Sequence, residues 1–170
     1  ADATKADRAC AEAFYRHVGR FLYRRPLNDK EVATRLDIAD ATAAKAGDFY
    51  KGLASGLASL MVTPTFLFVT DKVEPDPAGG MRLDGYSRAS RMSFLLWNTA
   101  PDEELLAAAS RGDLMKESGL EKQVARMVQS PRFESGVRAF FADMLAFDQF
   151  DTLEKDAVIY PAFTDVVARD

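Results

Sequence analysis

The sequence contains one cysteine, Cys10, and one histidine, His17, and this scarcity excludes several kinds of site. A structural zinc site needs four Cys or His ligands, so this chain alone cannot build one. An internal disulfide needs two cysteines, and covalent haem attachment needs a Cys-x-x-Cys-His sequence, which is absent. A serine triad would depend on His17, which lies in an amphipathic helical pattern with no nucleophile elbow in the chain. We therefore predict no catalytic and no metal-binding residues here.

Positive charge and long apolar stretches are also scarce. The net charge of -4 and the pI near 5.1 argue against nucleic acid or an anionic membrane as the main partner. Arg16, Arg20, Arg24 and Arg25 do cluster, but arginines at one helix end more often compensate the helix dipole in contact with solvent than bind phosphate. No stretch reaches the roughly 18–20 apolar residues that span a bilayer, so we predict no transmembrane segment.

What the sequence has in quantity is packing residues at helical spacing. Hydrophobic residues make up 48% of the 170, and twelve are phenylalanine. The spacing predicts an all-α fold of about seven helices, in two lobes that share a Phe- and Leu-rich core. We expect helices near residues 4–24, 28–47, 48–61, 87–97, 101–112, 117–129 and 131–145, with a short helical turn over 64–68.

Local signals place several helix ends and one close contact. Asn28 and Glu31 have the spacing of a capping box. Asp48 is expected to open the third helix, and Thr99 can cap the helix that follows Pro101. Gly52 and Gly56 are four residues apart, which favours close packing against a neighbouring helix; the alternative is a homo-oligomerisation groove.

A change of composition divides the chain into two parts. Residues 74–80 (Glu-Pro-Asp-Pro-Ala-Gly-Gly) contain two prolines and two glycines. We predict a helical lobe over residues 1–71, a Pro/Gly linker over 72–82, and a second helical lobe over 83–170.

Few side chains suggest chemistry. His17 could act as an axial haem ligand if another chain delivered the haem, but an ordinary histidine is favoured. Trp97 is expected in the core with its N–H bonded to a carbonyl, in preference to an exposed carbohydrate-stacking role. Asp148 and Asp151 flank a Phe-rich stretch where a cation site is conceivable, and loop solvation is the better interpretation.

Several motifs together are familiar. The stretches Phe21–Leu27, which contains Arg25, and Ser59–Leu67 resemble a module called domain of unknown function 1595. The stretches Leu83–Trp97, which contains Arg91, and Pro101–Leu105 resemble its usual neighbour, domain of unknown function 1592. The resemblance covers nearly the whole chain.

The resemblance implies a setting more than an activity. Such modules occur in large secreted or envelope proteins of planctomycetes and some proteobacteria, often beside a cytochrome-c-like domain. It therefore implies a periplasmic or secreted location, haem elsewhere in the parent protein or complex but no cofactor in this chain, and other segments or subunits as partners. In that setting Cys10 would form a disulfide with another segment or chain. This chain begins inside the first pattern and ends where the second should continue, so we expect it to be part of a longer protein.

We accordingly predict a non-catalytic structural or docking module of an exported, redox-associated assembly. One alternative is part of an oxidoreductase or polysaccharide-processing enzyme whose site another segment completes. It would require Arg91, Trp97 or the Asp148–Asp151 loop to line a deep polar pocket. The other alternative is a homo-oligomerisation module.

Overall fold

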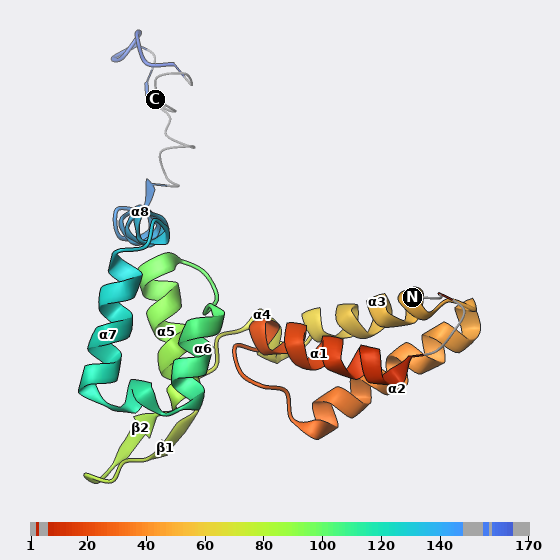
Figure 1. Cartoon of the computed structure of the whole chain (residues 1–170). Helices are drawn as coiled ribbons and strands as arrows, with labels where there is room; N and C mark the ends of the chain where they lie inside the picture. Colours follow the sequence, from red (N-terminus) through yellow and green to blue (C-terminus); the bar gives the residue numbers. More distant parts are fainter. Residues whose placement is uncertain (1–2, 4–6, 148–154, 157, 165–170) are drawn as a thin grey trace.

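The computed structural model describes residue 3 and residues 7–147, 155–156 and 158–164, and within these it is mostly helical. Figure 1 shows two helical groups joined by the segment that leads from α4 to β1. The first lobe contains α1 (Arg8–Leu22), α2 (Asp29–Ala46), α3 (Phe49–Met61) and the single turn α4 (Pro64–Leu67). The second lobe contains β1 (Val73–Pro75), β2 (Met81–Leu83), α5 (Gly85–Trp97), α6 (Glu103–Ser110), the 3-10 turn Asp113–Met115, α7 (Glu117–Val128) and α8 (Arg132–Met144).

The ends of α2 and α3 follow the local signals in the sequence. The Asn28 side chain accepts a hydrogen bond from the Glu31 backbone N–H, and the Glu31 carboxylate accepts one from the Asn28 N–H. Gly47 ends α2 in the left-handed conformation at φ 62°, and Asp48 then caps α3. The predicted capping box and the predicted start of the third helix are confirmed.

The two glycines of α3 allow it to lie directly against α2. A Cβ on Gly52 would collide with the backbone carbonyl of Ala39, and a Cβ on Gly56 would collide with the Tyr15 phenol and approach the Arg35 carbonyl to 3.0 Å. The prediction of close packing within the chain is confirmed. Because α2 already fills this groove, an oligomer of this chain would have to use another surface.

The Pro/Gly-rich segment is more ordered than a linker. Its flanks form an antiparallel hairpin in which Val73 pairs with Leu83 and Pro75 pairs with Met81. Gly79 and Gly80, whose φ angles are 101° and 85°, form the turn between the two strands. The prediction of a linker did not include this hairpin. Most of the predicted linker is therefore a β-hairpin of the second lobe, and residues 68–72 join the two lobes.

The buried side chains form two clusters instead of one shared core. The first contains Tyr15, Val32, Leu36, Leu60 and others of the first lobe, and the second contains Ala89, Trp97, Leu105, Leu114, Met127 and others of the second. Among the described phenylalanines only Phe49 is buried, so the core is not rich in this residue. Small residues such as Gly52 and Ala89 let the helices approach closely, which leaves less room for rings.

The second lobe corrects one prediction and confirms another. Asp102, not Thr99, caps α6, because its side chain reaches the Leu105 N–H at 2.9 Å. Trp97 is buried as predicted, and its indole N–H donates to the Met127 carbonyl at 2.9 Å.

Helix α8 packs across the end of α5, and the two backbones approach closely at one glycine. Gly136 is buried there, and a Cβ at this position would collide with the backbone at Leu96. None of the helices in the described part of the chain has the length and apolar character needed to cross a bilayer.

Candidate functional site

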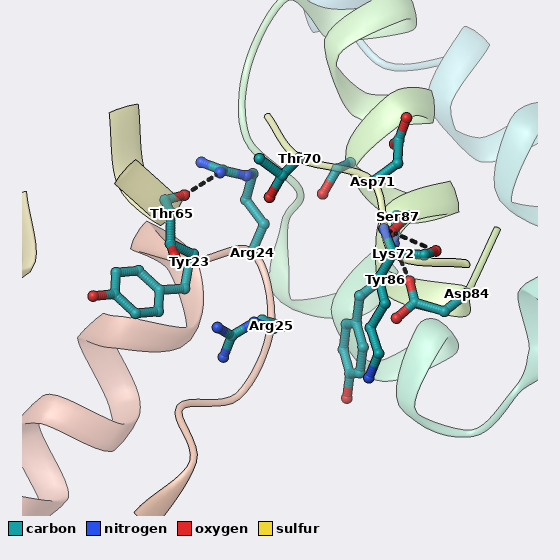
Figure 2. A pocket seen from close by; sticks show the side chains of 11 residues that line it. Tyr23, Arg24, Arg25, Thr65, Thr70, Asp71, Lys72, Asp84, Tyr86 and Ser87 are labelled. Carbon is teal, nitrogen blue, oxygen red and sulfur yellow. Dashed lines mark hydrogen bonds between the residues drawn. The ribbon is translucent and has the colours of Figure 1, made fainter. Parts of the chain in front are cut away.

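A polar cavity of about 210 Å³ lies where the two lobes meet. Figure 2 shows it from close by, with side chains from both lobes around it. The first lobe supplies Tyr23, Arg24, Arg25 and Thr65, and the second lobe, with the segment before it, supplies Thr70, Asp71, Lys72, Asp84, Tyr86, Ser87 and Ser90. The cavity therefore depends on the contact between the lobes.

Arg24 holds the first-lobe wall of this cavity in place. It is 8% exposed, its φ is 57°, and its guanidinium donates to the carbonyls of Thr65 at 2.5 Å and Phe68 at 2.8 Å. Burial and the neighbouring Arg25 lower the pKa of Arg24. The sequence interpretation of a solvated arginine is wrong for Arg24, because its charge is directed at the open carbonyl end of α4.

Arg25 forms an ion pair that also caps a helix. Its two terminal nitrogens donate to the two carboxylate oxygens of Glu31 at 2.8 and 2.9 Å, and one also donates to the Pro26 carbonyl. The hydrogen bonds from Arg25 lower the pKa of Glu31, with a smaller contribution from the Asn28 N–H. Arg25 thus ties the entrance of α2 to the cavity wall.

The second-lobe wall is held mainly by bonds to the backbone. Asp84 caps α5 through the Ser87 N–H at 2.7 Å, and the Ser87 hydroxyl accepts from the Lys72 N–H at 2.8 Å. Asp71 binds the Arg91 guanidinium, with its two oxygens each 3.0 Å from Nε. These hydrogen bonds, like those of Arg24, fix the cavity walls.

A separate charged cluster surrounds Trp97 at the other end of α5. Arg126 donates to both oxygens of Asp102, at 2.7 and 3.0 Å, and its guanidinium carbon lies 5.3 Å from the Trp97 ring centre. Arg132, at the start of α8, lies 5.0 Å from the same ring centre. Burial alone would raise the pKa of Asp102, but the hydrogen bonds from Arg126 and Leu105 outweigh it and lower that pKa. This cluster joins α5, α6, α7 and α8.

Helix α8 also carries an exposed apolar stripe. Phe140, Phe141 and Met144 are 51%, 44% and 56% exposed. With Val137 and Leu145 they lie three and four residues apart along the helix, on one side of it. We call these five residues the α8 stripe.

The predicted site residues do not converge on one pocket. Arg25 lines the interlobe cavity. Arg91 is exposed and lies beside the cavity, where it pairs with the lining residue Asp71. Trp97 is buried in the second cluster. The enzymatic alternative required such groups around a deep pocket, and Arg91 and Trp97 are not placed in that way. Asp148 and Asp151 lie outside the described residues.

The two rare residues lie on α1. Cys10 is an exposed free thiol, and its disulfide with another segment stays a prediction. His17 is exposed, with its ring 5.6 Å from that of Phe21. The haem-ligand hypothesis also stays a prediction. Among the described residues no group of three or more His, Cys, Asp or Glu side chains could hold a metal ion.

Sequence reasoning did not identify Lys72 and Tyr86 as cavity residues. Lys72 lies in the predicted linker over residues 72–82. Tyr86 lies in the Leu83–Trp97 stretch that resembles domain of unknown function 1592, without a predicted role of its own. No local pattern points to either residue, because the cavity is formed by side chains from both lobes.

The described structure is that of a two-lobed helical protein, with a polar cavity between the lobes and an exposed apolar stripe on α8. Residues 83–170 match the family model described as PSD4, protein of unknown function (DUF1592), and residues 10–71 match that described as PSD5, protein of unknown function (DUF1595). The first match spans just over half of the sequence, so the chain belongs to the DUF1592 family, with a DUF1595 module before it. Comparison with curated proteins and with solved structures gave no match.

Proposed function

We propose that this chain is a non-catalytic docking module of a larger exported, redox-associated assembly. The observation that carries the proposal is the α8 stripe. Soluble monomers rarely leave contiguous large apolar side chains uncovered, and such patches mark interaction surfaces. The exported location and the redox association rest on the resemblance to modules that share chains with cytochrome-c-like domains.

The stripe has the pattern of a helix-binding surface. Val137, Phe140 and Met144 follow one another at intervals of three and four residues, so their side chains lie in line on successive turns. An amphipathic partner helix buries its own apolar face in a surface of this kind. We therefore propose that an amphipathic helix from another domain or subunit of the assembly binds the stripe.

The charges on α8 favour a polypeptide over a membrane surface. The helix carries two arginines, Arg132 and Arg138, and two acids, Glu134 and Asp143. Interfacial membrane helices are rich in lysine and arginine on their polar face, and α8 has no such excess. The overall charge of -4 points the same way.

The polar side chains around the interlobe cavity support the non-catalytic part of the proposal. Arg24, Arg25 and Ser87 each bind backbone groups. A general acid or base needs a free proton-transfer atom within hydrogen-bond reach of a substrate. These groups are engaged in holding the fold.

Site-specific photo-cross-linking in the native host tests the proposal. A cross-linker replaces Phe141 in the stripe, and the matched control replaces Ser135, which is exposed on the opposite side of α8. We expect the Phe141 position to capture an apolar helical peptide of another domain or subunit, and the Ser135 position not to capture it.

Three results would contradict the assignment. Capture of a second copy of α8 would indicate a homo-oligomer, and capture of residues 155–164 would indicate that the chain covers its own stripe. Equal capture from both positions would show that the stripe has no specific partner.

A further inference from the structure

The contact between the lobes encloses a second hollow beside the polar cavity. It has a volume of about 280 Å³ and is lined by Arg20, Pro26, Tyr86, Leu106, Ala107, Ser110 and Arg111. Tyr86 lines both hollows, and Pro26 follows Arg25 of the first directly. We call the two hollows together the interlobe cleft.

The lining of the interlobe cleft has more cationic than acidic side chains, although the protein has a negative net charge. Its lining contains five cationic side chains, Arg20, Arg24, Arg25, Lys72 and Arg111, and two acidic ones, Asp71 and Asp84. The whole chain carries a net charge of -4. A concave surface lined by an excess of cationic side chains attracts anions, because the surrounding protein concentrates the electric field in the hollow.

Not all of these cations are free to bind a ligand. Arg24 is bound to carbonyl oxygens of α4, and Arg25 is bound to Glu31. The acid Asp71 is likewise occupied by Arg91, and Asp84 by the N-terminus of α5. These four side chains hold the structure around the cleft, and the remaining cations are the ones available to bind a ligand.

Three cations retain unused hydrogen-bond donors. One Arg20 terminal nitrogen donates to Glu103 at 2.8 Å, but Arg20 Nε is buried and has no hydrogen-bond partner. Arg111 uses Nε for Asp113. Within the described part of the chain the Lys72 ammonium has no hydrogen bond or ion pair, and Figure 2 shows this side chain extending in the same direction as Tyr86.

We propose that the interlobe cleft binds a small anion through Arg20, Lys72 and Arg111. The ligand is an oxyanion, carboxylate or phosphate, since arginine and lysine donors match such oxygens. Arg20 comes from α1, whereas Lys72 and Arg111 come from the hairpin side and the end of α6. Binding therefore links the two lobes, and neither lobe alone holds the complete set of donors.

Calorimetric titration of the full chain with inorganic phosphate and with citrate tests the proposal. Sodium chloride at the same ionic strength is the reference, because it supplies screening without an oxyanion. We expect saturable binding of at least one of the two anions, and the tighter one distinguishes phosphate from carboxylate chemistry. We also expect Lys72→Gln and Arg111→Gln each to weaken that binding about tenfold.

Lys51→Gln is the matched control, because Lys51 is an exposed lysine on α3 outside the cleft. It removes the same charge and should leave the affinity within about twofold of the parent chain. Far-ultraviolet circular dichroism confirms that each variant is folded. Absence of saturable binding beyond the chloride reference would overturn the proposal, as would an equal loss of affinity in Lys51→Gln and the two cleft variants.

Discussion

Single side chains in this protein often serve two elements at once. Glu31 closes the capping box of α2 and also pairs with Arg25 beside the interlobe cavity. Asp102 caps α6 and pairs with Arg126 of α7. A carboxylate that bonds both a helix N-terminus and an arginine is held more strongly than either contact alone would hold it.

Replacement of Glu31 by glutamine tests this dual role. Glutamine can still accept from the Asn28 N–H, but it loses the charge that pairs with Arg25. We expect Glu31→Gln to lower the free energy of unfolding at pH 7 by about 1 kcal/mol. Urea unfolding curves measure the change, and Glu121→Gln, at an exposed position of α7, should change it by less than about 0.5 kcal/mol.

The same substitution makes a prediction about pH. The pKa of Glu31 is lowered in the folded protein, so its charge contributes stability above the ordinary value of 4.5, and this contribution is lost as the pH falls toward the lowered pKa. The difference between the parent chain and Glu31→Gln should therefore shrink as the pH falls below about 4.5. A difference that stays constant with pH would show that the ion pair is not its source.

At the scale of elements, backbone contact decides how the helices pack. Gly52 and Gly56 bring α3 against α2, and Gly136 brings α8 against the end of α5. The first contact is extensive, but the second leaves the α8 stripe uncovered. A helix that packs on α5 with one side and exposes an apolar stripe on another is suited to receive a partner.

Replacement of Gly136 by alanine tests the α8 contact. Alanine favours a helix over glycine by up to about 1 kcal/mol, but its Cβ would meet backbone atoms of Leu96 and Trp97 that cannot move aside easily. We expect a net loss of about 1–3 kcal/mol in the free energy of unfolding. Thermal unfolding measures this change. Ser135→Ala, at an exposed position one residue away, should cause no loss in the same measurement. A stabilised Gly136→Ala would mean that α8 does not pack here.

Much of the element order was predictable because its signals are local. The Asn28–Glu31 box and the Asp48 cap lie within a few residues of the helices they begin, and the burial of Trp97 follows from the apolar spacing before it. The interlobe cleft was not predictable in this way. Lys72 lines one of its hollows, and Arg20 and Arg111 line the other. These residues are far apart in the sequence, and the two hollows meet at Tyr86 only because the lobes are in contact.

At the scale of the whole molecule, the two proposed binding regions are separate. The interlobe cleft lies where the first lobe meets α5 and α6, and Figure 1 shows α8 at the end of the second lobe beyond α5 and α7. The Arg20–Glu103 pair joins the lobes at the cleft, and the Trp97 cluster joins α8 to its neighbours. Occupation of the cleft and docking on the stripe are therefore expected to be independently measurable.

Amide hydrogen exchange across α8 is the most direct test of the docking function. Exchange of residues 132–144 is measured in the isolated chain and in the assembly purified from its native source. We predict slower exchange of α8 in the assembly, with α2 and α3 unchanged, because a partner helix that covers the stripe stabilises α8 against local opening. Equal exchange of α8 in the two samples would contradict the account.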